Sequence, residues 1–354
     1  EDGMQPNTNP TMLNFSPAQR DIIEVPSPHV RDTTGSLFDI TPLTSPNNSG
    51  FHRNRNWYAE QRIFTHFEAD TFAVSRTKAQ IANGEHLVFV HRYVDGYLRG
   101  RSGDLNIVRE PCYIYMLDLA SSVECVQRPA TMQTIIIPKA ALGFHPDRHP
   151  PLVKLSVEIG IGKVLNSLFD LVFDGLLESN AIEYDTFNQL VACLQLGLGA
   201  PPTKGDIRAR ARRAMRGAIS RHIEQNLDRW DLSVDTILSN FGVSRASLYR
   251  LFDDRGGVRQ FISDRRLLRA VLDIAKGPLQ RGAISNVAER WGFSSGSNFN
   301  RAVRREFGVA PGSLINLPEE EFFELTNLRD LLDLKLNFDD SVERIARPDL
   351  LVAN

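Results

Sequence analysis

Two stretches of the sequence place an arginine six residues after a serine. They read LSVDTILSNFGVSRASLYRLF, residues 232–252, and AISNVAERWGFSSGSNFNRAV, residues 283–303. Ser244 precedes Arg250 in the first stretch, and Ser295 precedes Arg301 in the second. A guanidinium group forms paired hydrogen bonds with guanine edges and with phosphate oxygens. The repeated spacing therefore predicts contact with a nucleic acid.

Each copy predicts two short helices joined by a tight turn. An aromatic residue and a glycine end the first helix, because glycine accepts the left-handed conformation, and the serine caps the second helix. Apolar residues at helical spacing would hold each pair together: Ile237, Leu238, Leu248, Leu251 and Phe252 in the first, and Val287, Ala288, Trp291, Phe299 and Val303 in the second. This is the pattern of a helix-turn-helix, whose second helix enters the major groove of DNA.

The segment between the copies, VRQFISDRRLLRAVLDIAKG at residues 258–277, predicts one long connecting helix. Its apolar stripe comprises Val258, Phe261, Ile262, Leu268 and Leu272. Two recognition helices on one face of duplex DNA must lie about 34 Å apart, one helical turn. We expect the connector to fix that distance.

Charge is distributed unevenly along the 354 residues. Residues 204–316 hold 21 basic and 11 acidic side chains, whereas residues 1–203 hold 16 and 22, and residues 317–354 hold 4 and 10. Nineteen of the 21 basic residues in the middle block are arginine. A basic block between two acidic ones indicates a module that binds a polyanion. A solvated, arginine-rich helical surface is the alternative.

The rest of the chain predicts a second domain. Residues 1–35 are rich in Asn, Pro, Thr and Ser, which is typical of a flexible segment. Residues 57–143 form short β-rich runs separated by turns, which predicts an antiparallel sandwich or barrel. Two amphipathic helices are expected at 154–178 and 183–198, followed by a linker at 201–206. The fold class is therefore α+β with two domains, residues 36–200 and 207–316, and an acidic helical extension at 317–354.

Residues 207–316 resemble the DNA-binding domain of AraC/XylS-type bacterial transcription regulators. The resemblance lies in GVSRASLYRLF, ISDRRLLRA and AERWGFSSGSNFNRAVRREFGVAPGSL. Residues 57–200 are similar to the regulatory half of that family, which implies an antiparallel, cupin-like β-barrel followed by a helical hairpin. The chain departs from the pattern at residues 109–112, where Arg-Glu-Pro-Cys stands in place of Pro-Gly-Asp. The resemblance also implies an all-α C-terminal domain with two helix-turn-helix units joined by a long helix.

The resemblance implies that the outward residues of both recognition helices contact DNA. These are Arg245, Ala246, Tyr249, Arg250, Ser295, Gly296, Ser297, Asn300, Arg301 and Arg304. Arg250 and Arg301 would each form paired hydrogen bonds with guanine or bind a phosphate. A salt bridge to a nearby acid is the alternative for either. Gly296 would allow close approach to DNA or simply make fewer contacts.

A small-molecule effector would lie inside the β-rich domain. The candidate lining residues are Phe72, Arg76, Phe89, His91, Tyr113 and Tyr115. Ordinary core packing is the alternative for each aromatic residue. Arg76 would need an anion or a carboxylate partner if it pointed inward, because an unpaired buried charge is costly.

No catalytic, cofactor or metal-binding pattern is present in the sequence. His86 and His91 are five residues apart, and the period of two along a strand puts them on opposite faces. The three cysteines are far apart and form no C-x-x-C pair. No apolar run is long enough to span a bilayer, so we expect a cytoplasmic protein. Because these catalytic and metal-binding patterns are missing from the sequence, we also expect that it is not an enzyme and carries neither cofactor nor metal.

These observations predict a sequence-specific regulator of transcription that binds double-stranded DNA. By family resemblance it would be an activator and a homodimer, with the helices at 154–178 and 183–198 as the interface or packed on their own barrel. The acidic extension would pack on the basic domain or contact RNA polymerase. Two alternatives stay open: a regulator without an effector, controlled by abundance or a protein partner, and a cupin-type small-molecule-binding or catalytic protein with a DNA anchor.

Overall fold

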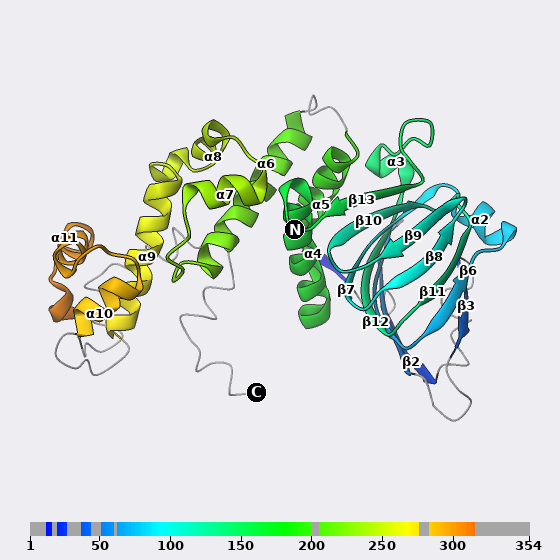
Figure 1. The fold of residues 1–354 in the computed structure, drawn as a ribbon, viewed down its shortest axis with the longest axis horizontal. Coiled ribbons are helices and arrows are strands. Elements are labelled where there is room, and N and C mark those ends of the chain that lie inside the picture. Colours follow the sequence, from blue (N-terminus) through cyan, green and yellow to red (C-terminus); the bar gives the residue numbers. More distant parts are fainter. Residues whose placement is uncertain are drawn as a thin grey trace, which may run out of the picture. The chain divides into compact units, whose positions relative to one another are not determined.

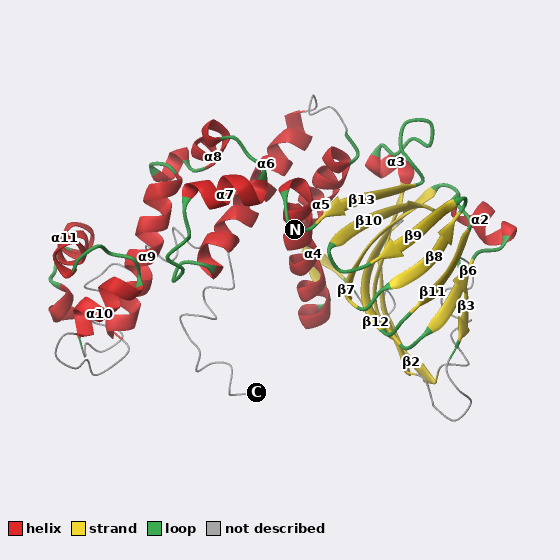
Figure 2. Cartoon of the chain, viewed as in Figure 1, coloured by secondary structure: helices red, strands yellow, loops and turns green. Residues whose placement is uncertain are grey.

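The computed structural model describes residues 12–15, 20–26, 37–43, 51–59, 62–199, 205–275 and 283–315. The chain divides into two compact units, one of residues 1–218 with 239–243 and the other of residues 219–238 with 244–354 (Figure 1). The described strands all lie in the first unit, and the described elements of the second are helical (Figure 2). The α+β class is confirmed, whereas the domain limits at 201–206 and 316 stay predictions. No helix of the described residues is long and apolar enough to cross a membrane.

The first unit is built on two antiparallel sheets. The seven-stranded sheet has the order β13-β10-β7-β12-β5-β4-β2, and the five-stranded sheet has the order β3-β6-β11-β8-β9. The strands of the larger sheet are β2 (Arg20–Pro26), β4 (Phe51–Ala59), β5 (Arg62–Ala69), β7 (Leu87–Asp95), β10 (Tyr113–Asp118), β12 (Ala130–Pro138) and β13 (Leu152–Ser156). Those of the smaller sheet are β3 (Asp39–Pro42), β6 (Phe72–Ser75), β8 (Leu98–Ser102), β9 (Leu105–Arg109) and β11 (Val123–Gln127).

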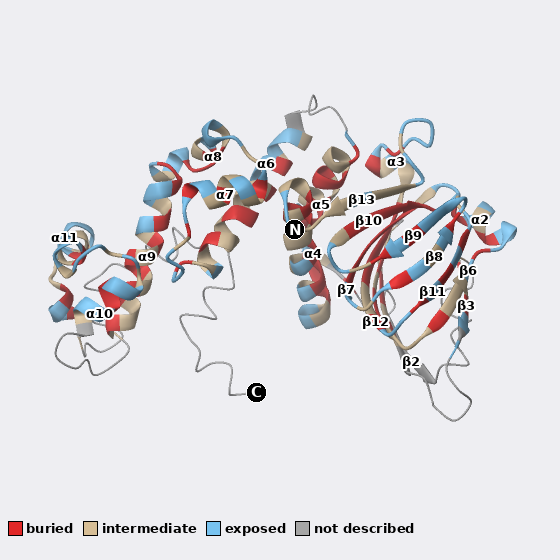
Figure 3. Ribbon diagram, viewed as in Figure 1, coloured by how far each residue is buried: buried red, intermediate tan, exposed pale blue. Residues whose placement is uncertain are grey.

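The two sheets pack face to face as a sandwich. Side chains alternate between the faces of a strand, so every second residue of each strand points into the space between the sheets. Phe67 and Phe89 of the larger sheet belong to the same buried cluster as Phe72 and Leu98 of the smaller one. Figure 3 shows the buried residues running along these strands.

The predicted antiparallel arrangement is confirmed, but closure into a barrel is not shown. The larger sheet ends at β13 and β2, and the smaller one ends at β3 and β9. Among the described strands, each sheet therefore has two end strands and no ladder that joins them.

Two long helices, α4 (Gly160–Ser179) and α5 (Tyr184–Gly197), cover the other face of the larger sheet (Figure 2). Arg92 of β7 reaches α4, where one guanidinium nitrogen lies 2.6 Å from an Asp170 carboxylate oxygen. The rings of Phe64 on β5 and Phe187 on α5 meet edge to face at 5.6 Å. Shorter elements complete the unit: β1 (Met12–Asn14), α2 (Lys78–Gly84), α3 (Lys139–Leu142) and β14 (Ala181–Glu183).

The helix predicted at 154–178 begins later than expected. Leu152–Ser156 form strand β13, which pairs with β10, and the helix starts at Gly160. Two prolines at 150–151 precede the strand. The strand itself is too short for the periodicity of its apolar residues to distinguish a strand from a helix. A Cβ atom at Gly162 would lie 2.0 Å from the Ser156 carbonyl oxygen, so glycine permits the close approach of helix and strand.

The second unit consists of packed helices. Its elements are α6 (Gly205–Gln225), α7 (Val234–Phe241), α8 (Arg245–Leu251), η3 (Asp253–Arg255), α9 (Val258–Ala275), α10 (Ala283–Arg290), α11 (Gly296–Phe307) and η4 (Pro311–Leu314). Parts of α6 and α7 are assigned to the first unit. The predicted connector is confirmed as α9. Glu224 of α6 pairs with Arg265 and Arg269 of α9, and it lies 3.2 Å from the latter. The acidic extension lies outside the described residues.

Candidate functional site

The first helix-turn-helix comprises α7 and α8, as the sequence predicts. Gly242 ends α7 with a φ of 61°, a left-handed conformation that glycine adopts without strain. Ser244 then caps α8, because its hydroxyl accepts a hydrogen bond from the Ser247 backbone N–H at 3.2 Å. Ile237, Leu248 and Phe252 are fully buried and hold the pair together.

The exposed face of α8 carries the predicted contact residues. Arg245 and Arg250 are exposed, and so is Ala246. Arg250 donates to the Ser247 hydroxyl at 3.3 Å. Arg245 forms an ion pair of 2.5 Å with Asp235 on α7, which is the salt-bridge alternative weighed for recognition arginines. Both members of that pair are exposed, so the pair adds little stability and is readily exchanged for another anion.

Tyr249 differs from the other predicted residues of α8 because it is half-buried. A Cβ atom at Gly257 would lie only 3.0 Å from its ring. Gly257 has a φ of 92°, so the backbone after η3 packs directly on the tyrosine. Tyr249 therefore has a packing role in this unit.

The second helix-turn-helix, α10 and α11, repeats the same construction. Gly292 has a φ of 75°, and the Ser295 hydroxyl accepts from the Asn298 backbone N–H at 3.1 Å. Phe299 and Val303 are fully buried in a cluster with Val271 and Ile274 of α9. The Trp291 indole N–H donates to the Asp273 carboxylate at 2.8 Å, which ties the turn to the connector.

The outer face of α11 presents Ser297, Arg301 and Arg304 to solvent. Arg301 donates to the side-chain oxygen of Asn298, and Arg304 donates to that of Asn300 at 3.0 Å. Asn300 is half-buried, so its amide is shared between helix packing and this contact.

Gly296 has a packing reason that the sequence did not reveal. A Cβ atom there would lie 3.2 Å from the Ser285 hydroxyl of α10. Glycine thus lets the start of α11 approach α10 closely.

Asn298 and Ser247 were missed as candidate site residues. Each stands three residues after its capping serine and accepts a hydrogen bond from the arginine three residues further on. The repeat itself carried this signal, since 247 and 298 are matching positions of the two copies.

The predicted effector residues separate into two groups. Phe72, Phe89, His91 and Tyr115 are buried between the two sheets, and the His91 and Tyr115 rings stack at 5.3 Å. Burial, with Arg109 nearby, lowers the pKa of His91 well below its usual value, so the ring is neutral. Tyr113 is half-buried, with the Lys154 ammonium 3.6 Å from its ring centre.

Arg76 is buried, but its partners are backbone carbonyls. Its guanidinium donates to the carbonyl oxygens of Leu37 at 2.9 Å, Gln80 at 2.7 Å, Ser121 at 3.2 Å and Leu119. Burial lowers its pKa, and Asp118 partly offsets that shift. The expectation that an inward Arg76 needs an anion is wrong, because these carbonyls satisfy its donors and give it a structural role.

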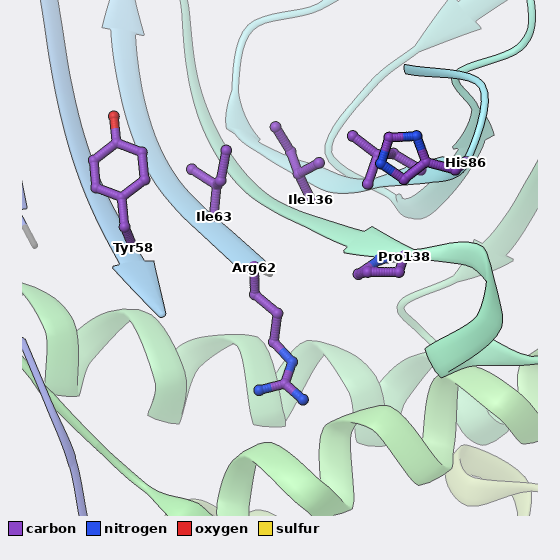
Figure 4. Close-up of a pocket in the computed structure, with 7 residues that line it drawn as sticks. Tyr58, Arg62, Ile63, His86, Ile136 and Pro138 are labelled. Carbon is purple, nitrogen blue, oxygen red and sulfur yellow. The ribbon is translucent and has the colours of Figure 1, made fainter. Parts of the chain in front are cut away.

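A pocket opens at one end of the sandwich (Figure 4). It has a volume of about 490 Å³. Its lining residues, which come from β4, β5, β7 and β12 and their ends, are Tyr58, Arg62, Ile63, His86, Leu87, Ile136 and Pro138. Apolar walls with a few polar groups suit a small organic ligand. The sequence did not indicate these residues, because only the register of the paired strands brings them together.

Arg109 is a further residue that the sequence did not single out. It ends β9 with 3% of its surface exposed, inside a segment that the sequence presented only as an unusual turn. Its Nε and one terminal nitrogen have no hydrogen-bond partner within the structure described. The described residues hold no group of three or more His, Cys, Asp or Glu side chains that could bind a metal ion.

Comparisons with known proteins agree with the geometry of the second unit. Residues 237–316 match the family model described as "Helix-turn-helix domain". The chain is 34% identical over 97 residues to LumQ of Photobacterium leiognathi, a probable transcriptional regulator, across 26% of this chain and 37% of LumQ. It is 30% identical over 96 residues to PqrA of Proteus vulgaris, a probable transcription factor, across 26% of this chain and 76% of PqrA.

The comparison with solved structures found, among others, two regulators of low overall similarity. One is the AraC-like transcriptional activator CuxR, with 16% identity and a TM-score of 0.42 over 71% of this chain and 95% of CuxR. Another is ToxT of Vibrio cholerae, with 16% identity and a TM-score of 0.28 over 76% of this chain and 99% of ToxT.

The paired helix-turn-helix units and the match to most of PqrA define a class, the DNA-binding regulators of transcription. The chain belongs to the AraC/XylS family of transcriptional regulators and carries the DNA-binding helix-turn-helix domain of that family.

Proposed function

We propose that the protein is a sequence-specific regulator that reads two adjacent major-groove segments with α8 and α11. The observation that carries this proposal is the repeated construction of the two helices. In each, a serine caps the first turn and an arginine six residues later stands exposed on the outer face. Exposed arginines near the start of a helix that follows a tight turn are suited to base edges and phosphates.

The proposed roles differ along each helix. Arg250, Arg301 and Ser297 face base edges, and Arg245 and Arg304 hold phosphates. Arg245 exchanges Asp235 for phosphate on binding, which costs little because the ion pair is exposed. Ala246, Ser295, Gly296 and Asn300 lie along the same contact strip, and Tyr249 supports it from below.

The regulator acts as an activator and as a homodimer in this proposal. The apolar residues of α4 and α5 are buried against their own sheet, with Phe169, Phe173 and Phe187 almost fully covered. The alternative of packing within one chain therefore accounts for the apolar stripe, and a dimer would use other faces of these helices. Sedimentation of the full chain at micromolar concentration tests the dimer, and a strict monomer would exclude it.

The first unit binds a small-molecule effector in the sandwich. The pocket at one end of the larger sheet and the four buried candidate residues Phe72, Phe89, His91 and Tyr115 support this assignment. Effector binding then changes DNA affinity through the linkage between the two sites. RNA polymerase is the further partner of an activator.

Selection of genomic fragments with the purified full chain tests the DNA assignment. The wild type is expected to enrich a few fragments with repeated half-sites. Arg250→Ala combined with Arg301→Ala should lose this preference while keeping salt-sensitive background binding. A control that removes two exposed arginines of the first unit, Arg99→Ala with Arg101→Ala, should select the same fragments as the wild type. Equal enrichment by wild type and the recognition-helix variant would withdraw the role of these arginines.

A further inference from the structure

A row of polar side chains crosses the inner face of the larger sheet. Tyr115 of β10 lies opposite His91 of β7, His91 opposite Thr134 of β12, Thr134 opposite Thr65 of β5, and Thr65 opposite Asn56 of β4. Directly opposed residues share a face of a sheet. The neighbouring row contains Leu117, Phe89, Ile136 and Ile63, of which the first three are buried and Ile63 packs against the same interior cluster. A polar row within this apolar sandwich needs a physical reason.

Several polar groups between the sheets are buried and have no partner within the described structure. On the larger sheet they are the amide nitrogen and oxygen of Asn54, the His91 Nε2 and the Thr134 hydroxyl. On the smaller sheet they are the Gln127 amide nitrogen, the Ser102 hydroxyl, and the Nε and one terminal nitrogen of Arg109. Each of these side chains has 3% or less of its surface exposed. A folded chain rarely buries so many unpaired polar groups side by side.

The polar groups of the two sheets face one another. The Tyr93 hydroxyl of β7 donates to the Gln127 side-chain oxygen of β11 at 3.1 Å, which joins the inner faces. Gln127 and Arg109 flank Leu98 in the smaller sheet, opposite it on either side. The charge of Arg109 acts on His91, Tyr93 and Tyr115 of the larger sheet. The polar row and Arg109 therefore lie near one another between the two sheets.

Arg109 would set the charge of a ligand bound between the sheets. Desolvation by burial lowers its pKa, and the groups that partly offset the shift are Tyr93, Cys125 and Tyr115, none of them a carboxylate. His91 is neutral and so adds no second positive charge. One guanidinium with two unpaired nitrogens, Nε and one terminal nitrogen, can donate to both oxygens of a single carboxylate. The remaining unpaired amide, imidazole and hydroxyl groups are suited to hydroxyls of the ligand.

We propose that the sandwich interior binds a small hydroxylated carboxylic acid, whose carboxylate is held by Arg109 and whose hydroxyls are read by Asn54, His91, Thr134 and Gln127. This inference rests on the proposed effector function and names the chemical class of its ligand. The pocket at the sheet end lies on the same inner face, because it includes Ile63 and Ile136, two residues from Thr65 and Thr134 on their strands. It gives the ligand its way in, past Tyr58 and His86 (Figure 4).

Binding of acids and matched neutral compounds to the full chain tests the proposal. The probes are lactate, gluconate, glucuronate and galacturonate, with glucose and glucitol as neutral counterparts and glycerol phosphate as a phosphate probe. Calorimetry at fixed salt is expected to find at least one acid that binds while its neutral counterpart does not. Arg109→Gln should weaken that acid by about 10- to 100-fold, because a charge-assisted pair is lost. The control Arg101→Gln, an exposed arginine on β8, should bind it as the wild type does.

Two further variants keep the test independent of folding defects. Thr134→Val keeps the shape of the side chain and removes one unpaired hydroxyl, so it should fold as well as the wild type and bind the acid more weakly. Arg109→Met removes an unpaired buried charge, so without ligand its melting temperature should equal or exceed that of the wild type. A clear fall in the melting temperature of Arg109→Met would mean that the chain itself supplies the missing anion, which overturns the proposal.

The remaining outcomes separate this inference from the proposed function. Binding only of neutral compounds, or of glycerol phosphate in place of the acids, overturns the ligand class and leaves an effector function standing. Failure of every acid overturns the inference, whatever the fragment selection shows. Loss of fragment selection with acid binding intact overturns the DNA assignment alone.

Discussion

Glu224 of α6 holds two arginines of α9, the helix that joins the two helix-turn-helix pairs. Its carboxylate pairs with Arg265, whose side chain is 6% exposed, and lies 3.2 Å from Arg269. Glu224→Ala would leave Arg265 buried with no carboxylate to accept its hydrogen bonds. Alanine is a good helix former, so the change does not weaken α6 by itself.

The expected cost follows from the burial of the pair. Removing one partner of a buried ion pair costs about 3–5 kcal/mol, because an uncompensated charge stays in the interior. The Glu224 side chain is 16% exposed, so water reaches part of the network. We therefore expect a loss of about 2–4 kcal/mol, which corresponds to a roughly 30- to 1,000-fold faster exchange of α9 amides.

Hydrogen exchange followed by mass spectrometry measures this effect in the full chain, peptide by peptide. The double variant Glu224→Leu with Arg265→Met should recover most of the protection, since replacing a whole buried pair by apolar groups is often neutral. Glu289→Ala, the loss of an exposed acid on α10, should leave α9 unchanged. Unchanged α9 exchange in Glu224→Ala, or equal losses in the single and double variants, would refute the reasoning.

Three other changes test local features. Ser295→Ala removes the hydroxyl that caps α11 and should cost about 1 kcal/mol of stability, which Ser295→Asp restores; urea unfolding measures it, and identical midpoints for the serine and alanine proteins would contradict the cap. Arg76→Met leaves four carbonyl oxygens without their donor and should lower the free energy of unfolding by at least about 3 kcal/mol. The exposed Arg101→Met should lower it by about 0.5 kcal/mol or less. Similar urea midpoints for the two variants would exclude a structural role for the Arg76 hydrogen bonds. Burial lowers the pKa values of His66 and His91, so the unfolded chain binds more protons than the folded chain as the pH falls. The contribution of the two neutral rings to stability is therefore full above the unfolded pKa of about 6.5. It is lost as the pH falls through the folded pKa values. His66→Gln with His91→Gln should flatten the decline of the urea midpoint below about pH 6.5, whereas the exposed His145→Gln should not; an unchanged slope in the double variant would mean that the two rings are protonated in the folded chain.

The second unit was predictable because its signals are local. A glycine that must take a positive φ, a serine that caps the next helix and apolar residues at spacings of three and four all lie within about 20 residues of one another. Gly242 and Ser244 therefore took their predicted places, as did Gly292 and Ser295. Strand β13 was missed because five residues carry too short a period to distinguish strand from helix.

The interior of the sandwich was only half predictable, because it depends on strand register. Phe72, Phe89, His91 and Tyr115, four of the six candidate lining residues, are buried between the sheets. Asn54 and Thr134 were not candidates, since neither is unusual until pairing sets it beside a neighbour. Arg76 was misjudged for a similar reason: its partners are backbone carbonyls of α2 and of loops distant in the sequence, and backbone acceptors leave no mark in a sequence.

The two recognition helices share more than the position of an arginine. In each, the residue three places after the capping serine donates its backbone N–H to that serine and accepts a hydrogen bond from the arginine three places further on. Ser247 and Asn298 thus link the cap of the helix to the side chain that would meet DNA. Orienting an arginine in this way lowers the conformational entropy lost on binding.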